Sequence, residues 1–257
     1  MGNELEVLPT AALAAEAAAL RFAKLASDAI RARGEFIVAL AGGSTPRSMY
    51  ARLAAPPLAT SFDWSCVQVL FGDERCVPPD HEASNYRMAS EALLDHVPIP
   101  VANVHRIHGE DDPAEAGAVY ERVLRRVLRT PSGPPRESPG ARIDLVLLGL
   151  GEDGHTASLF PGHAGSPDNP AWVRAVYVPA ASAVAAWRVT LTPVIINAAA
   201  EVAFLVSGAA KAGIVRRVLE GPRSRPPELP AQLIAPAAGR MVWYLDAAAA
   251  AELQGGG

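Results

Sequence analysis

The chain has 257 residues, of which 50% are hydrophobic and 19% are charged, and its formal net charge at pH 7 is −4. This composition provides enough apolar residues for a sizeable core, and the lack of a basic surplus argues against nucleic-acid binding. The N-terminal segment lacks the basic start of a secretory signal, and no apolar run approaches the roughly 18 residues that a membrane span needs. We therefore expect a cytoplasmic protein without a membrane or nucleic-acid partner.

The first predicted element is an alanine-rich helix from about Thr10 to Arg33, which Thr10 caps and Gly34 ends. Beyond it, short and continuous apolar runs alternate with helical patterns. Runs of this kind are typical of strands that are buried on both faces of a parallel sheet. The alternation predicts an α/β fold with a doubly wound, mostly parallel sheet and helices on both faces. The runs lie at 36–40, 67–71, 143–149 and 202–207, with two more strands at 172–178 and about 242–245, and the helical patterns at 46–54, 84–95, 113–129 and 209–219.

Two segments rich in proline, glycine and serine, at 130–140 and 221–230, interrupt this pattern and predict exposed loops. Because the segments on either side of them resemble strands of one sheet, we treat residues 1–257 as a single domain. The two cysteines, Cys66 and Cys76, lack zinc-site spacing with the histidines. We expect them to be free thiols in a reducing compartment.

Loops that leave the carboxyl ends of these strands are the expected place for a ligand, because open α/β sheets bind there. After the first apolar run comes the glycine loop, AGGSTP, at 41–46. Its paired glycines, its two hydroxyls and the start of the next helix, expected at Pro46, favour an anion such as phosphate. A tight turn followed by a helix cap accounts for the same residues equally well.

Charged residues follow two other strands. Asp73, Glu74 and Arg75 come just after the second apolar run, a position unsuited to a solvated face, although a salt-bridged loop would also explain them. Lys211 lies in the first turn of the helix after the fourth run, where the helix dipole disfavours a cation by about 0.3–1 kcal/mol. A nearby anion would reverse that effect, while a lysine that bends into water would need no ligand.

The stretch VLLGLGEDGHTASLFPG, at 146–162, contains the Gly-x-Gly-x-x-Gly spelling of a dinucleotide-binding loop. That function requires a following helix, a second strand and an acidic residue about 20 residues further on. Asp168 lies at the required distance, but Pro161 and Pro167 on the way to it exclude a strand that ends there. The helix expected after Gly154 is also very short. We therefore expect no nicotinamide cofactor.

His155 differs from the other five histidines, which lie in polar or loop contexts. It follows a buried strand by way of a glycine-rich loop, and Asp153 precedes it by two residues. A lone histidine is more often structural than catalytic, but this position favours a catalytic base beside a carboxylate. A serine nucleophile is less suitable, because no Gly-x-Ser-x-Gly elbow is present and Ser158 falls within the expected short helix.

Taken together, these segments resemble the 6-phosphogluconolactonase family, in order along the chain and over most of it, from about residue 35 to 246. The resemblance implies the NagB/RpiA/CoA transferase-like fold. The related glucosamine-6-phosphate deaminases share a similar Asp-Gly-His loop, which typically continues Ile-Ala-Phe-Asn-Glu-Pro; this chain continues with Thr156 to Pro161, the lactonase version. Ala41 departs from the family, in which serine often stands there. The matching segments are AGGSTP, GDERCVPPDHEASNYRMA, GLGEDGHTASLFPG, RVTLTPVIINAA, LVSGAAKAGIVRRVL and the ending PAQLIAPAAGRMVWYLD.

The resemblance implies that a monomer hydrolyses 6-phospho-D-glucono-1,5-lactone to 6-phospho-D-gluconate in the oxidative pentose phosphate pathway, without a metal or an organic cofactor. His155 would be the general base that activates water, and Asp153 would orient it. Arg75 would face the lactone and assist the oxyanion, with Asp73 holding Arg75 in place. The substrate would be bound, at its phosphate, by Gly42, Gly43, Ser44, Thr45, Arg188 and Lys211.

Two alternatives remain open at the level of the sequence. Asp73 or Glu74 would share the proton transfer with His155 if their carboxylates faced the same site. A sugar-phosphate sensor is the second alternative, because bacterial regulators use a related fold. Such sensors normally carry a helix-turn-helix segment and lack the catalytic residues, whereas Asp153 and His155 are both present here.

Overall fold

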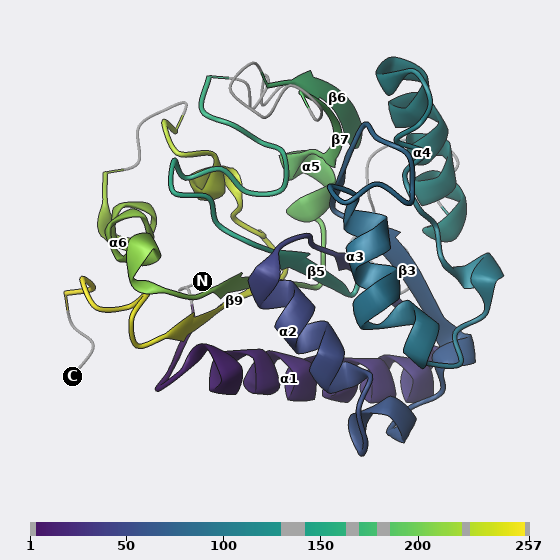
Figure 1. The fold of residues 1–257 in the computed structure, drawn as a ribbon, viewed down its shortest axis with the longest axis horizontal. Helices are drawn as coiled ribbons and strands as arrows, with labels where there is room; N and C mark the ends of the chain where they lie inside the picture. The colour runs from purple at the N-terminus through teal and green to yellow at the C-terminus, as the bar shows by residue number, and fades with distance from the viewer. Residues whose placement is uncertain (1–3, 130–141, 163–169, 179–185, 223–226, 255–257) are drawn as a thin grey trace.

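The computed structural model describes residues 4–129, 142–162, 170–178, 186–222 and 227–254 (Figure 1). The predicted loop at 130–140 and the centre of the predicted loop at 221–230 lie outside the described residues. Asp168 lies outside them as well.

A six-stranded parallel sheet, the main sheet, forms the centre of the molecule. Its strands are β1 (Glu4–Leu8), β2 (Phe36–Leu40), β3 (Val67–Phe71), β5 (Leu145–Leu148), β8 (Glu201–Val206) and β9 (Arg240–Asp246). Their order is β1-β9-β8-β5-β2-β3, and every neighbouring pair is parallel. The strands β2, β5 and β8 are buried along their whole length, which explains their continuous apolar sequences. The predicted parallel sheet is confirmed.

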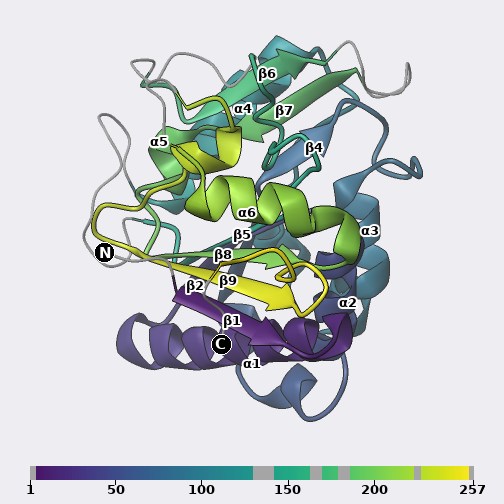
Figure 2. The same ribbon diagram turned by 90° about the vertical axis from the view of Figure 1, so that its left-hand side faces the viewer.

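The α-helices of the described residues are α1 (Ala11–Arg33), α2 (Ser44–Leu53), α3 (Asn85–Ala92), α4 (Pro113–Val127), α5 (Pro193–Ile196) and α6 (Ala212–Glu220). Figure 2 shows α1 beneath the main sheet and α6 above it, as a doubly wound fold requires. The ends of α1 are as predicted, because the Thr10 hydroxyl accepts a hydrogen bond from the Leu13 N–H and Gly34 ends the helix with φ of 78°. None of the described helices has the length and apolar character to cross a membrane.

A second, smaller sheet is present, although the sequence predicted only one. It is antiparallel and consists of β4 (Asp73–Arg75), β7 (Trp187–Leu191) and β6 (Val173–Tyr177), with α4 packed against it (Figure 2). Gly72 joins the two sheets, since its N–H donates to the Leu40 carbonyl and its carbonyl accepts from the Leu191 N–H, each at 2.8 Å. The strand β4 escaped prediction because its sequence, Asp-Glu-Arg, is untypical of strands.

Several predicted boundaries differ from the structure, and one strand was missed. The helix α2 begins at Ser44, so Pro46 is its third residue rather than its first. Proline is still accepted there, because N–H groups of the first turn have no partner within the helix. The helix α3 ends at Ala92 instead of residue 95. The strand β1 was not predicted, because its Glu-Leu-Glu-Val alternation gives no continuous apolar run.

Two buried tyrosines hold the ends of neighbouring strands. The Tyr50 hydroxyl accepts from the Ala41 N–H at 2.9 Å and donates to the Ala41 carbonyl at 2.8 Å, directly after β2. The Tyr120 hydroxyl bonds in the same way to Phe71, the last residue of β3, at 2.6 and 3.0 Å. Each bonded residue is followed by a glycine, at which the next loop departs.

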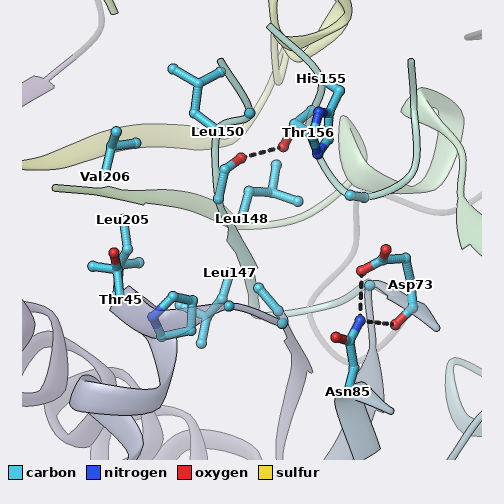
Figure 3. Close-up of a pocket in the computed structure, with 18 of the residues that line it drawn as sticks. Thr45, Asp73, Asn85, Leu147, Leu148, Leu150, His155, Thr156, Leu205 and Val206 are labelled. Atoms are coloured by element: carbon cyan, nitrogen blue, oxygen red, sulfur yellow. Dashed lines mark hydrogen bonds between the residues drawn. The ribbon is translucent and has the colours of Figure 1, made fainter. Parts of the chain in front are cut away.

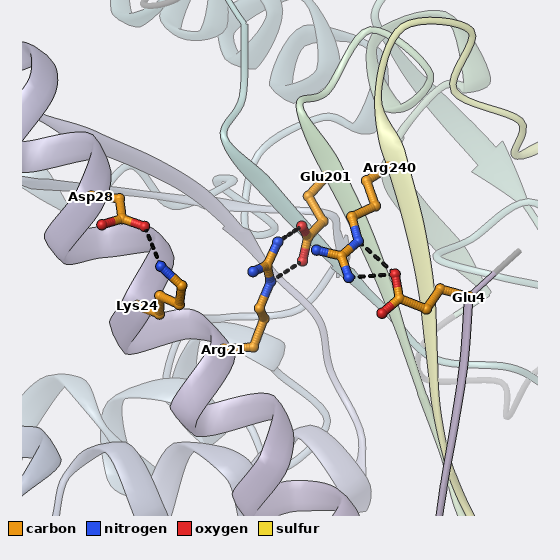
Figure 4. Close-up of polar contacts among 6 residues, drawn as sticks. All are labelled: Glu4, Arg21, Lys24, Asp28, Glu201 and Arg240. Carbon is orange, nitrogen blue, oxygen red and sulfur yellow. Dashed lines mark hydrogen bonds and ion pairs between the residues drawn. The ribbon is translucent and has the colours of Figure 1, made fainter. Parts of the chain in front are cut away.

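Ion pairs gather at the amino edge of the main sheet, which is the edge where its strands begin (Figure 4). Arg21 of α1 binds both carboxylate oxygens of Glu201, the first residue of β8. The side chain of Glu201 is only 4% exposed, and Arg21 is the cation that pairs with this buried carboxylate. The pairs at this edge each join one arginine to one carboxylate: Arg21 to Glu201, Arg240 to Glu4, and Arg33 to Asp144.

Candidate active site

A pocket of about 270 Å³ lies at the carboxyl edge of the main sheet, the edge where its strands end (Figure 3). The ends of β2, β5 and β8 and the start of the small sheet form its wall. Every residue that the sequence predicted for the site belongs to this wall, except Asp153, which contacts a wall residue. The predicted residues in the wall are Gly42, Gly43, Ser44, Thr45, Asp73, Arg75, His155, Arg188 and Lys211.

His155 is held by Asp153. Its ring Nδ1 lies 2.6 Å from Asp153 Oδ1, and its backbone N–H donates to the same oxygen at 3.0 Å. A carboxylate at Nδ1 keeps that nitrogen protonated and leaves Nε2 as the acceptor. Burial disfavours the charged form of Asp153, but the hydrogen bonds from His155 outweigh burial and lower the pKa of this carboxyl. Asp153 is therefore ionised at neutral pH and stabilises a protonated imidazole.

Two glycines of the dinucleotide-like spelling have other reasons to be glycine, and one of them makes room for His155. A Cβ atom at Gly151 would lie 2.0 Å from His155 Nδ1, so only glycine leaves room for the ring. Gly154 has φ of 83°, which residues with a side chain rarely adopt. The short helix predicted after Gly154 is absent from the described residues 151–162, which form turns. Without that helix the loop lacks the N-terminus on which a dinucleotide pyrophosphate would bind.

Phe160 belongs to the site, although the sequence did not single it out. Its ring stacks on the His155 imidazole, with 4.3 Å between the ring centroids and 27° between the planes. The guanidinium carbon of Arg188 lies 5.3 Å from the same ring centroid. The aromatic face therefore restrains the imidazole and attracts the positive charge of Arg188. The signal available in the sequence was an aromatic residue five positions after His155.

Asp73 does not hold Arg75, which corrects the expectation from the sequence. The Asp73 carboxylate accepts a hydrogen bond from the Ser158 hydroxyl at 2.6 Å and another from Asn85 Nδ2 at 3.1 Å. Arg75 donates from Nη1 to the Ala83 carbonyl at 2.7 Å, and its buried Nε has no partner in the described part of the chain. Asp73 and Arg75 share one face of β4, but each bonds to different neighbours.

Glu74 has a structural role. Its carboxylate accepts hydrogen bonds from the backbone N–H groups of Arg75, Asn85 and Tyr86 and from the Ser84 hydroxyl. Since α3 starts at Asn85, Glu74 caps the N-terminus of that helix. Burial raises the pKa of Glu74 in spite of these bonds. Glu74 is not in the pocket wall, and its carboxylate is occupied by these hydrogen bonds, which favours His155 over Glu74 as the base.

The cations around the pocket form no close ion pair with a carboxylate of the described residues, although Asp73 attracts Arg188 from a longer distance. Lys211 forms no ion pair there, and Arg188 lies opposite Arg75 in the small sheet, with its buried Nε unbonded. Burial, and then repulsion by Arg75, lowers the pKa of Arg188. The hydroxyls of Thr45 and Ser207 lie 2.8 Å apart at the start of α2, and the sequence had not indicated Ser207. Together with the helix N-terminus, these groups suit a phosphate.

The remaining groups with a capacity for chemistry are metal ligands and thiols. In the part of the chain that the structure describes, no group of three or more His, Cys, Asp or Glu side chains is arranged to hold a metal ion. Cys66 and Cys76 are free thiols, as predicted. Burial raises the pKa of Cys76 to about 11, so this thiol is not a reactive thiolate at neutral pH.

Comparison with known proteins shows close relatives over almost the whole chain. A family model for glucosamine-6-phosphate isomerases/6-phosphogluconolactonase matches residues 9–243. A 6-phosphogluconolactonase from Nostoc sp. is 40% identical over 255 residues, which cover 98% of this chain and 99% of the relative. A probable chloroplastic 6-phosphogluconolactonase 4 from Oryza sativa subsp. indica is 39% identical over 233 residues, which cover 90% of this chain and 70% of the relative.

Solved structures share the fold. A 6-phosphogluconolactonase from Trypanosoma cruzi superposes with a TM-score of 0.85 at 28% identity, over 99% of this chain and 98% of that one. A monomeric glucosamine-6-phosphate deaminase superposes with a TM-score of 0.79 at 21% identity, over 97% of this chain and 99% of that one. The second likeness concerns the fold alone.

Proposed function

Because the chain belongs to the family of glucosamine-6-phosphate isomerases and 6-phosphogluconolactonases, we propose that it hydrolyses 6-phospho-D-glucono-1,5-lactone to 6-phospho-D-gluconate in the oxidative pentose phosphate pathway. The Nostoc relative, which has that lactonase name, matches this chain from end to end. One observation carries the proposal: a histidine paired with a carboxylate lines the same pocket as cations that lack carboxylate partners.

The phosphate of the substrate binds, in this proposal, at the end of the pocket built from the glycine loop. Gly42, Gly43, Ser44 and Thr45 offer backbone N–H groups and hydroxyls at the N-terminus of α2. Lys211 and Arg188 provide the positive charge. This assignment is supported by the absence of any carboxylate partner for these two cations among the described residues, since an anionic ligand then supplies the missing partner.

The chemistry starts with a water molecule beside His155. Nε2 takes a proton from this water as the hydroxide attacks the lactone carbonyl carbon, and Arg75 stabilises the oxyanion that forms. When the tetrahedral intermediate collapses, the bond from that carbon to the ring oxygen breaks, and the imidazolium gives its proton to the ring oxygen. Asp153 stabilises the imidazolium between the two transfers. The product carboxylic acid then loses its proton to water.

The test is the hydrolysis of freshly generated lactone, followed against its spontaneous loss. Wild-type protein should accelerate the reaction, and His155→Asn should lower kcat by about 10²–10⁴ with little change in KM, because general-base catalysis contributes that much. A wild-type protein that binds 6-phosphogluconate without accelerating hydrolysis would instead be a sugar-phosphate sensor. A His155→Asn variant that kept most of its kcat would move the search for the base to Asp73.

Further properties belong to the same proposal: residues 1–257 act as a single-domain, cytoplasmic monomer that needs neither metal nor organic cofactor. The single domain is supported by one hydrophobic cluster that joins both sheets. Light scattering should give the mass of one chain. Lactonase activity should survive exhaustive chelation, and recovery of lost activity by added zinc or magnesium would contradict this part.

A further inference from the structure

The side chain of Asn85 joins two parts of the pocket wall. It is 2% exposed, and its Nδ2 donates to the Asp73 main-chain carbonyl at 2.9 Å and to Asp73 Oδ1 at 3.1 Å (Figure 3). Since both of these partners only accept hydrogen bonds, the nitrogen must face Asp73 and Oδ1 must face the other way. This buried Oδ1 has no hydrogen-bond partner within the described residues.

Gly42 lies against that oxygen. A Cβ atom at this position would lie 2.0 Å from Asn85 Oδ1 and 2.5 Å from Asn85 Cγ, a separation that no real Cβ adopts. Gly42 is not among the glycines with positive φ, so its backbone conformation does not require glycine. The contact with Asn85 is therefore the reason that glycine stands at position 42.

The adjacent Gly43 is glycine for a different reason. Its φ is 110°, which side chains rarely allow, whereas a Cβ there would meet only Pro46 Cδ, at 3.8 Å. The two glycines of the loop are therefore needed for two different reasons. Gly43 has a backbone conformation that other residues rarely adopt, and Gly42 leaves space for the side chain of Asn85.

Asn85 is itself firmly placed. It is the first residue of α3, and its backbone N–H donates to Glu74 Oε1 at 2.7 Å. Its side chain then reaches both Asp73, beside the catalytic end of the pocket, and Gly42, at the phosphate end. Among the described residues, Ser158 also bonds to the Asp73 carboxylate, but it does not approach the position of a Cβ in the glycine loop.

We propose that Asn85 is a positioning residue that fixes the distance between the phosphate-binding glycine loop and Asp73. The proposal rests on the lactonase function above. A six-carbon substrate with its phosphate at one end and its lactone carbonyl at the other must meet both ends of the pocket at once. A misplacement of about 1 Å can cost about 10²-fold in rate, so the distance between the two ends matters for catalysis.

A double-mutant cycle between Gly42→Ala and Asn85→Ala tests this role through kcat and KM for the phosphorylated lactone. Gly42→Ala alone should lower kcat/KM by about 10²-fold, because its methyl group displaces the loop or Asn85. Asn85→Ala alone should lower it by about 10-fold through the two lost hydrogen bonds. In the double variant the methyl group has room, so its kcat/KM should equal that of Asn85→Ala. Additive losses would overturn the proposal.

Two controls isolate the contact. Gly43→Ala is strained whatever stands at position 85, so Asn85→Ala should not rescue it. Asn85→Asp keeps the oxygen near Gly42, so it should not rescue Gly42→Ala; rescue in either case would contradict the proposal.

Substrate dependence separates positioning from stability. Asn85→Ala should lower kcat/KM for the phosphorylated lactone more than for unphosphorylated gluconolactone, which does not use the glycine loop, and equal losses would contradict the proposal. If the proposed lactonase function were wrong, the wild-type protein would not hydrolyse the lactone at all. That result differs from every outcome that contradicts the role of Asn85 alone.

Discussion

The arginines at the amino edge of the main sheet each pair with a carboxylate, whereas the cations around the pocket at the carboxyl edge have none within the described residues. Arg21 and Arg33 at the amino edge and Arg188 at the carboxyl edge are all partly buried, so these three arginines have lost part of their hydration. At the amino edge the lost hydration is offset inside the protein, by residues such as Glu201. At the carboxyl edge, the buried Nε of Arg188 has no hydrogen-bond partner among the residues that the structure describes. In the proposed function, an anionic ligand supplies at the carboxyl edge the negative charge that carboxylates supply at the amino edge.

The largest expected effect on this comparison comes from Arg21→Met. Removing Arg21 leaves Glu201 buried without its partner, and we expect a loss of roughly 3 kcal/mol in the free energy of unfolding, the low end for a buried pair. Activity of the folded variant should be unchanged. Urea denaturation measures the loss, and the double variant Arg21→Met/Glu201→Leu should recover most of it. A loss of kcat in the folded single variant would show that the amino edge affects catalysis as well as stability, contrary to the comparison of the two edges.

The next effect concerns binding at the carboxyl edge. Lys211→Ala and Arg188→Ala should each raise KM for the phosphorylated lactone by about 10- to 100-fold, because each removes a charged hydrogen-bonding partner of the phosphate. Neither should lower the melting temperature as Arg21→Met does, since no carboxylate loses its partner. Unphosphorylated gluconolactone is the control substrate, and an equal rise in KM for both substrates would refute the phosphate assignment.

A smaller effect is expected at Phe160, which lies between the histidine and a pocket cation. Phe160→Leu removes the aromatic face and should lower kcat by about 2- to 10-fold, the value of one stacking interaction. Phe160→Tyr keeps the ring and should retain most of the activity. Steady-state kinetics on the three proteins checks this. A Leu variant with wild-type kcat would show that the stack does not restrain His155.

The smallest effect is expected from an exposed pair at the amino edge. A hydrogen bond from Arg240 lowers the pKa of Glu4, so its contribution to stability is present above the ordinary carboxyl pKa and is lost as pH falls through the lowered value. Glu4→Gln should cost at most about 1 kcal/mol at pH 7, because the pair is exposed. In thermal unfolding at several pH values, the difference from wild type should shrink in acid. A constant difference would rule out the charge as its cause.

The sequence predicted those strands whose apolar pattern matches their burial in the folded protein. β2, β3 and β8 are buried, so continuous apolar runs identified them. β1 and β4 were missed because charged residues interrupt them. Whether the strands formed one sheet or two depended on the hydrogen bonds of Gly72 to strands of both sheets, which no local pattern records.

The site was predictable as a set of residues but not as a set of contacts. Loops that leave parallel strands meet at one edge of a sheet, so the predicted residues were brought together. Their roles came from the family resemblance. The partner of Asp73 was predicted wrongly, because Ser158 lies 85 residues away and approaches only through tertiary packing. Asn85 and Phe160 were missed for the same reason: each acts through the neighbours it touches.

The bonds of Tyr50 and Tyr120 fix the residues from which the glycine loop and the β4 segment leave the main sheet. Each phenol gives one residue the donor and the acceptor that an adjacent strand would otherwise provide, and burial raises the pKa of both phenols, so both keep their protons. Exchange of the Ala41 and Phe71 amide hydrogens with solvent then requires the opening of a fully buried side chain. The glycine loop and the β4 segment therefore leave the main sheet from two fixed points, and Asn85 contacts both segments beyond those points.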